Sequence, residues 1–166
     1  MAGAVKVVDR GARRVLRNVR RSASRSVDVG IIGTKAGSAH QGSAQVTVAQ
    51  VAEWAEFGLG QPQRSWLRAW VDANLDRINE QIDAEVGRVV AGEADPEQVL
   101  QRLGLWLVGE MQANISNFPE NGFEPNAPST IAQKGSDTPL IDKGQLRSSI
   151  TSRVTPTRSG PPALGS

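Results

Sequence analysis

Two long amphipathic segments, joined by a short break, constrain the fold of this chain more than any other sequence feature. The first runs from about Ser65 to Val90, and its apolar stripe recurs at helical spacing in Leu67, Val71, Leu75, Ile78, Ile82, Val86 and Val89. Gly92-Glu93-Ala94 ends this helix, and Asp95-Pro96 is a pair typical of a new helix start, which we expect to extend to about Asn117. Because the break is short, the two helices are predicted to pair antiparallel.

Shorter segments rich in β-branched residues predict a small sheet beside these helices. Residues 27–33, 44–48 and 148–154 are the expected strands, and residues 49–57 are expected to form a helix that stops at Gly58. The predicted fold class is α+β, with two long antiparallel helices packed on a small antiparallel β-sheet, a basic N-terminal helix and an extended hairpin arm.

The length of the chain, 166 residues, fits one domain with appendages. We assign residues 1–25 to the basic amphipathic N-terminal helix, 26–154 to a single α+β domain and 155–166 to a C-terminal tail. Within the domain, residues 34–44 are mostly small or polar and are expected to form a flexible arm. Residues 118–147 are rich in Pro and Gly and are expected to form a long loop region.

Charge is divided unevenly, because residues 1–25 carry a net charge of +7 and the remaining residues −5. Apolar spacing predicts a helix from Val5 to Val19, through Gly11, with its basic residues on the opposite side. These basic residues are expected to contact DNA or an acidic partner: Lys6, Arg10, Arg13, Arg14, Arg17, Arg20 and Arg21. Residues 1–53 contain no aromatic side chain for base stacking, which favours a solvated or protein-contacting face over nucleic acid.

Composition argues against catalysis, cofactors and membranes. The chain has no Cys and only His40, so no metal or other cofactor is expected. Acidic residues are scattered, Ser129 and Ser136 lack a His/Asp pattern, and Lys134-Gly135-Ser136 lacks the upstream glycine of a phosphate-binding loop. We therefore do not expect an enzyme. No apolar run approaches the roughly 20 residues that span a bilayer, so no membrane partner is expected and synthesis is expected in the cytoplasm.

Two blocks of sequence carry a family resemblance. The first is Val51-Ala52-Glu53-Trp54-Ala55-Glu56-Phe57-Gly58 followed by Pro62-Gln63-Arg64-Ser65-Trp66-Leu67-Arg68, with Trp66 where Phe is usual. The second runs from Pro125 through Ser129-Thr130-Ile131-Ala132-Gln133-Lys134-Gly135, and then from Pro139-Leu140-Ile141-Asp142 to Ile150. In this order, and over about residues 45–154, the chain resembles the neck and tail-completion proteins of tailed bacteriophages, a family of virion morphogenesis and minor tail components.

The resemblance implies a non-enzymatic virion protein at the phage head–tail junction, made in the host cytoplasm. It implies a homo-oligomeric ring, sixfold or twelvefold, that joins the connector to the tail, with other neck, connector and tail proteins and packaged DNA as partners. The expected core or subunit-interface anchors are Trp54, Phe57, Arg64, Trp66, Trp70, Leu140 and Leu146. Glu56 and Arg64 are expected to pair across the loop between them.

Two other classes of function stay open at this point. The first is a free nucleic-acid-binding protein that uses the Arg-rich N-terminal helix. The second is a hydrolase that depends on one carboxylate or on Ser129.

Overall fold

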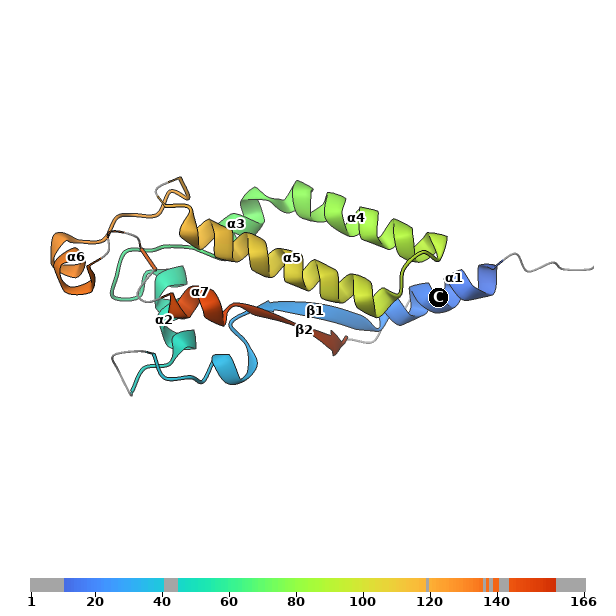
Figure 1. Ribbon diagram of the computed structural model, residues 1–166, viewed down its shortest axis with the longest axis horizontal. Helices are drawn as coiled ribbons and strands as arrows, with labels where there is room; N and C mark the ends of the chain where they lie inside the picture. The colour runs from blue at the N-terminus through green and yellow to red at the C-terminus, as the bar shows by residue number, and fades with distance from the viewer. Residues whose placement is uncertain are drawn as a thin grey trace, which may run out of the picture.

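The computed structural model describes residues 11–40, 45–118, 120–135, 137, 139–140 and 144–157. Helices and one two-stranded antiparallel sheet make up this part of the chain, which confirms the α+β class (Figure 1). In chain order the elements are α1 (Ala12–Ala23), β1 (Arg25–Gly30), η1 (Gly33–Lys35), α2 (Val48–Phe57), α3 (Arg68–Ala73), α4 (Leu75–Ala91), α5 (Pro96–Ser116), α6 (Pro128–Lys134), α7 (Gln145–Ser149) and β2 (Thr151–Pro156).

Helix α5 lies directly on the sheet, and α4 lies on the far side of α5 (Figure 1). In the sheet, Val27 of β1 stands opposite Val154 of β2. Gly104 is the point of closest approach, because a Cβ there would lie 2.8 Å from Ser152 Cβ and 2.8 Å from Val27 Cγ2. The absence of a side chain at this position therefore sets how closely α5 packs on the two strands.

The start of α5 follows the local signals in the sequence. Asp95 accepts a hydrogen bond from the backbone N–H of Glu97 (2.9 Å), and Pro96 occupies the first helical position. The predicted helix 96–117 is confirmed to within one residue. Likewise, α2 ends at Gly58, which is left-handed (φ 70°) and donates its N–H to the carbonyl of Trp54.

The single helix predicted from Ser65 to Val90 is wrong, because it is divided into α3 and α4 at Asn74. Asn74 has φ −121° and ψ 18°, outside the helical region, and its side chain donates to the carbonyl of Trp70 (2.8 Å). A short amide side chain that bonds the neighbouring backbone competes with the helix, and the apolar spacing continues across the break without showing it.

The three-stranded sheet is also wrong within the described residues, because residues 45–48 form no strand of the sheet. Thr47 makes one isolated bridge with Ala39 and then caps α2, where its side chain accepts the N–H of Gln50 (3.2 Å). The strand predicted at 27–33 lies at 25–30. The strand predicted at 148–154 begins only at Thr151, because residues 145–149 form α7.

The described part of the predicted arm, residues 34–40, lies against the domain and does not extend from it. Lys35 Nζ donates to the carbonyl of Ser148 (2.8 Å), and Gln145 Nε2 donates to the carbonyl of Ala39 (3.0 Å). Residues 41–44 lie outside the described residues, as does the tail beyond residue 157. Two short helices, α6 and the start of α7, lie within the predicted loop region 118–147.

The N-terminal helix begins later than the apolar spacing predicts. Gly11 has φ +102°, which is not helical, and α1 starts at the next residue. The predicted passage of a helix through Gly11 is therefore wrong, and the part of the prediction that covers residues 1–10, with Lys6 and Arg10, lies outside the described residues.

Two clusters of buried apolar side chains make up the core. The larger is formed by α2, α5, α7 and the segment around Trp66, and contains Ala52, Ala55, Trp66, Met111, Ile115, Phe123, Leu146 and Ile150. The smaller lies where α4 meets α5 and contains Val89, Val99 and Leu103. Most of the clustered buried apolar side chains therefore belong to the larger cluster.

Candidate assembly surfaces

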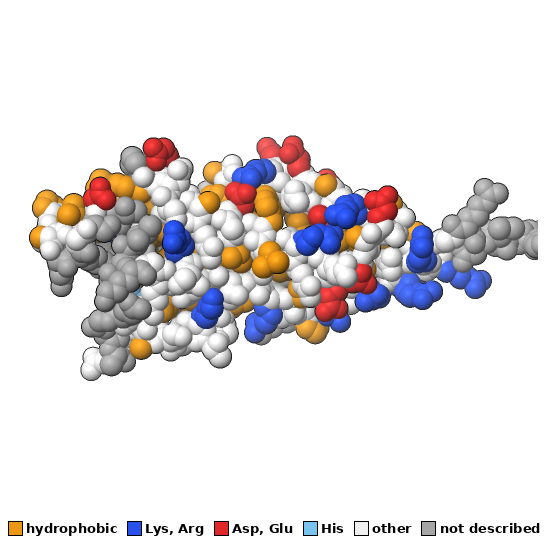
Figure 2. All heavy atoms as spheres, viewed as in Figure 1, with side chains coloured by type: hydrophobic (Ala, Val, Ile, Leu, Met, Phe, Trp, Pro, Cys, Tyr) orange, Lys and Arg blue, Asp and Glu red, His pale blue; other side chains and the backbone are white. Residues whose placement is uncertain are grey.

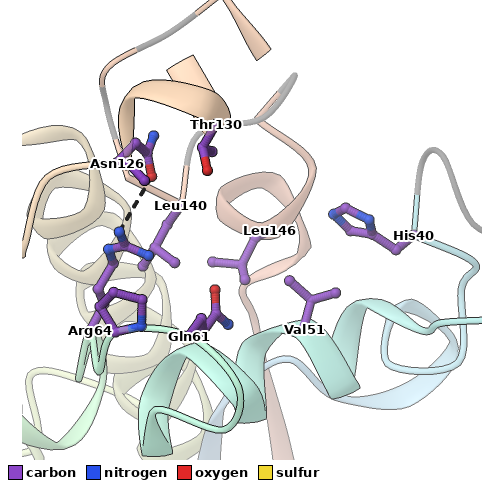
Figure 3. Close-up of a pocket in the computed structure, with 10 residues that line it drawn as sticks. His40, Val51, Gln61, Arg64, Asn126, Thr130, Leu140 and Leu146 are labelled. Carbon is purple, nitrogen blue, oxygen red and sulfur yellow. Dashed lines mark hydrogen bonds between the residues drawn. The ribbon is translucent and has the colours of Figure 1, made fainter. Parts of the chain in front are cut away.

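The two sequence blocks that carry the resemblance pack against each other. Arg64, from the first block, is buried and donates from Nε to the carbonyl of Glu124 (2.9 Å) and from Nη2 to the carbonyl of Pro125 (3.2 Å). Nη2 also reaches Oδ1 of Asn126 (3.4 Å), the bond dashed in Figure 3. Burial lowers the pKa of Arg64, and the charge of Glu124 offsets part of that effect. Arg64 thus fixes the start of the second block onto the first.

A cavity of about 160 Å³ lies between the two blocks. Figure 3 shows Leu140 and Leu146 beside Arg64 and Asn126, with Val51 of α2 below them and His40 on the opposite side. Arg64 donates all three of these hydrogen bonds to residues 124–126, and Asn126 lines the cavity. The cavity therefore lies between two segments that Arg64 holds together.

Glu56 organises the start of α3. Its carboxylate accepts hydrogen bonds from Ser65 Oγ (2.7 Å), from the backbone N–H of Leu67 (3.0 Å) and from both the backbone N–H and Nε of Arg68 (3.1 Å each). The predicted pair of Glu56 with Arg64 is therefore wrong, because Arg64 points to the second block and Arg68 is the ionic partner. The first N–H groups of a helix lack intrahelical acceptors, and Glu56 supplies one.

Burial alone raises the pKa of Glu56, but the hydrogen bonds from Ser65, Leu67 and Arg68 outweigh it and hold the pKa below its ordinary value of 4.5. Glu85 behaves similarly: hydrogen bonding from Arg102 lowers its pKa, burial opposes the shift, and the charges of Arg102 and Arg88 add to it. Both carboxylates are thus stabilised in the charged form by the fold.

These shifts predict a loss of stability in acid. Both folded-state pKa values lie below the ordinary value of 4.5 that applies to the unfolded chain. The stabilisation is therefore complete well above that pH and is lost as the pH falls through the folded-state pKa values. We expect the urea midpoint to be flat from about pH 7 to 5.5 and to fall steeply below about pH 4.5. The double variant Glu56→Gln, Glu85→Gln should be less stable at neutral pH and lose less on acidification. A parallel decline in both proteins would contradict this assignment.

The predicted anchors divide between core and surface. Trp66 and Leu146 are buried, and Trp70 and Leu140 pack against the larger core cluster. Trp54 and Phe57 lie on the surface of α2, where Phe57 is 51% exposed beneath the guanidinium of Arg68, at 4.7 Å from the ring centroid. Core and surface positions were not separable from the sequence, because Trp66 and Trp70 lie at helical spacing just as Trp54 and Phe57 do.

Helix α1 presents the predicted basic face to solvent. Arg13, Arg14, Arg17, Arg20 and Arg21 are all exposed, and Figure 2 shows Lys and Arg side chains gathered over the end of the molecule formed by α1. Arg21 pairs with Asp95 (3.2 Å) and Arg14 lies over Gly92, which hold the helix to the turn between α4 and α5. Arg17 and Arg20 make no ion pair within the described part of the chain.

An apolar groove lies beside the smaller core cluster, between α1, α4 and α5. It has a volume of about 270 Å³, its floor includes Val89, Val99 and Leu103, and its walls include Val19, Ile82, Val86 and Val90. Exposed fractions are 44% for Val19, 47% for Val86 and 45% for Val90, and Leu16, on the same helix as Val19, is 58% exposed. A contiguous apolar surface of this kind marks an interaction site more often than an isolated exposed side chain does.

An acidic row lies on α4, the helix that forms one wall of this groove. Asp76, Glu80 and Asp83 are exposed and make no ion pair within the described residues. Acidic side chains lie along the edge over α4 in Figure 2. This row was not predicted as a functional surface, although its spacing of four and three residues is visible in the sequence and repeats that of Arg13, Arg17 and Arg20.

Within the described residues, no helix has the length and apolar character needed to cross a bilayer. The same residues hold no group of three or more His, Cys, Asp or Glu side chains placed to bind a metal ion. Comparison of the chain with protein-family models, curated proteins and solved structures gives no match.

Proposed function

We propose that this chain is a structural protein of a tailed-phage virion, a neck or tail-completion component that forms a ring at the head–tail junction and joins the connector to the tail. The observation that carries the proposal is that the two sequence blocks with the family resemblance pack against each other in the fold. Arg64 of the first block holds residues 124–126, and Leu146 of the second packs in one core with Ala52, Ala55 and Trp66. The matching residues therefore serve to hold the fold rigid, as a structural protein requires.

The distribution of charge and apolar surface supports the same proposal. One end of the molecule is basic, α4 carries an exposed acidic row that makes no ion pair within the described residues, and an apolar groove lies between α1, α4 and α5. Two long helices, α4 and α5, paired beside a small sheet give such surfaces a rigid support. A ring component acts by presenting complementary surfaces to its neighbours, and these are surfaces of that kind.

Depletion of the protein during infection tests this proposal. If the chain completes the junction, infected cells that lack it should accumulate heads filled with DNA and separate tails, and supply of the full-length chain in trans should restore joined particles. Electron microscopy of the lysates gives the count of joined and separate structures. Normal numbers of joined, infectious particles without the protein would overturn the proposal.

A nucleic-acid-binding role is the second candidate. The observation that favours it is the exposure of Arg17 and Arg20 on α1, which form no ion pair with any other described residue. Phosphate contacts release counterions, so each one adds about 0.9 to the slope of log affinity against log salt on duplex DNA. Replacement of Arg17 and Arg20 with Gln should then lower that slope by about 2. Fluorescence anisotropy with a labelled duplex over a range of NaCl concentrations measures it. Unchanged affinity and slope would exclude α1 as the DNA contact.

A further inference from the structure

Arg64 is a buried cation that has no carboxylate partner within the described residues. Its side chain is 5% exposed, and its three hydrogen bonds go to neutral oxygen atoms, the carbonyls of Glu124 and Pro125 and Oδ1 of Asn126. Glu124 is exposed, and its carboxylate forms no ion pair with Arg64. A buried charge is costly unless a group of opposite charge neutralises it. The environment of Arg64 is therefore one that favours a bound anion.

One terminal nitrogen of this guanidinium, Nη1, donates to no acceptor within the described residues. In the same residues, every buried side-chain nitrogen and oxygen atom has a hydrogen-bond partner, so Nη1 lies next to open space. Arg64 lines the cavity of about 160 Å³ between the two sequence blocks, and this cavity is the open space beside it. The two N–H groups of Nη1 can therefore bind a molecule inside the cavity.

Two further polar side chains line this cavity and make no hydrogen bond to the described part of the chain. They are the amide of Gln61 and the hydroxyl of Thr130, which lie on opposite sides of the cavity in Figure 3. Much of the remaining wall is apolar and comes from Val51, Pro62, Leu140 and Leu146. The cavity thus combines one cation and two neutral polar groups with an apolar surface.

We propose that this cavity binds a carboxylate carried on a short aliphatic chain, with Nη1 of Arg64 as the cationic donor and Gln61 and Thr130 as further donors. A guanidinium binds a carboxylate more strongly than a neutral acceptor. The single charge of a carboxylate matches that of Arg64, whereas a doubly charged phosphate would bring an excess negative charge into a partly apolar cavity. The volume holds several water molecules, and so an acid of a few carbon atoms.

This chemistry has two sources, a small free acid and the glutamate side chain of another protein. Pro62, at the cavity wall, is exposed, so a side chain can enter from the surface. The inference goes beyond the proposed function and does not depend on it, because the site belongs to the isolated chain and is tested on that chain.

Titration of the full-length, ¹⁵N-labelled chain with sodium propionate at pH 7 and constant ionic strength tests the site. The Nε–H group of Arg64 is a suitable NMR probe, because it is buried and hydrogen-bonded to the carbonyl of Glu124 (2.9 Å), which slows its exchange with water. Propionate should shift this signal saturably. Propionamide has the same shape without the charge, and it should bind about tenfold more weakly.

Two variants test the polar donors without removing Arg64, which holds residues 124–126 in place. Thr130→Val and Gln61→Leu keep similar volumes, and each should weaken propionate binding about fivefold, because one hydrogen bond to the carboxylate is lost. Thr151→Val is the matched control, since Thr151 lies on β2 and does not line the cavity, and it should bind propionate as the natural chain does. Circular dichroism checks that each variant keeps the fold.

A blocked tripeptide with a central glutamate, compared with its glutamine counterpart, distinguishes the two sources. A saturable shift with propionate and with the glutamate peptide alone of the two supports the inference and identifies a protein side chain as the ligand. A shift with propionate but with neither peptide supports it and identifies a small free acid. No saturable shift with any carboxylate, equal affinity for propionate and propionamide, or unchanged binding by both cavity variants overturns the inference. The proposed function would then still stand, because the contacts of Arg64 with residues 124–126 need no ligand.

Discussion

Replacement of Glu56 with Ala is expected to lower the free energy of unfolding by about 3 kcal/mol, because four hydrogen bonds to a buried carboxylate are lost together. The donors left without this acceptor include the N–H groups of Leu67 and Arg68 at the start of α3, for which the described part of the chain shows no other side-chain acceptor. Equilibrium urea denaturation at neutral pH, followed by tryptophan fluorescence, measures the change, since Trp66 lies directly beside this site.

Glu53 provides the matched control for this experiment. It lies on the same helix, is exposed and makes no ion pair or hydrogen bond within the described residues. Glu53→Ala should change the free energy of unfolding by less than about 0.5 kcal/mol. If the Glu56 and Glu53 variants had equal stability, the role of Glu56 in holding the start of α3 would be contradicted.

Two Gly→Ala substitutions on α5 are expected to have opposite signs. Gly104→Ala should lower the free energy of unfolding by about 2 kcal/mol, because the new Cβ would lie 2.8 Å from side-chain atoms of both Ser152 and Val27 and the sheet would have to move. Gly109→Ala should raise it by about 0.5–1 kcal/mol, because nothing lies within 4 Å of that position and Ala favours a helix over Gly.

The pair separates packing from helix propensity, since both changes are the same substitution in the same helix. Thermal and urea denaturation of the two variants measure the difference, which we expect to be close to 3 kcal/mol. Stabilisation by both substitutions would show that α5 does not approach the sheet as closely at Gly104 as described.

Features set by a few neighbouring residues were predictable from the sequence. The start of α5 follows from Asp95-Pro96, and the end of α2 follows from Gly58, because caps and left-handed stops act over one turn. The first strand was expected within two to three residues of its position, because its β-branched residues lie close together in the sequence. It ends at Gly30, and not at Gly33 as expected.

The errors came from residues whose structure depends on competing local bonds or on distant partners. Val46 and Val48 look like the end of a strand, yet Thr47 and Gln50 form a reciprocal helix cap that sequence inspection could have found. The break at Asn74 depends on one amide turning back to the carbonyl of Trp70. The partner of Arg64 lies 60 residues away in the chain, so no local pattern pointed to it.

The candidate assembly surfaces were predictable in part. The basic face of α1 was expected, and its described arginines are exposed. The acidic row of α4 is visible in the sequence, but its exposure is known only from the fold. The groove itself depends on where α1 is held, through Arg21 and Asp95, which are 74 residues apart.

The copy number of this protein in purified virions tests the central proposal most directly. Quantitative mass spectrometry against a portal or tail-tube standard, with cryo-electron microscopy of the same particles, should give six or twelve copies per virion, as a ring between the connector and the tail. Purified, infectious virions that contain no copies of the protein would contradict the proposal.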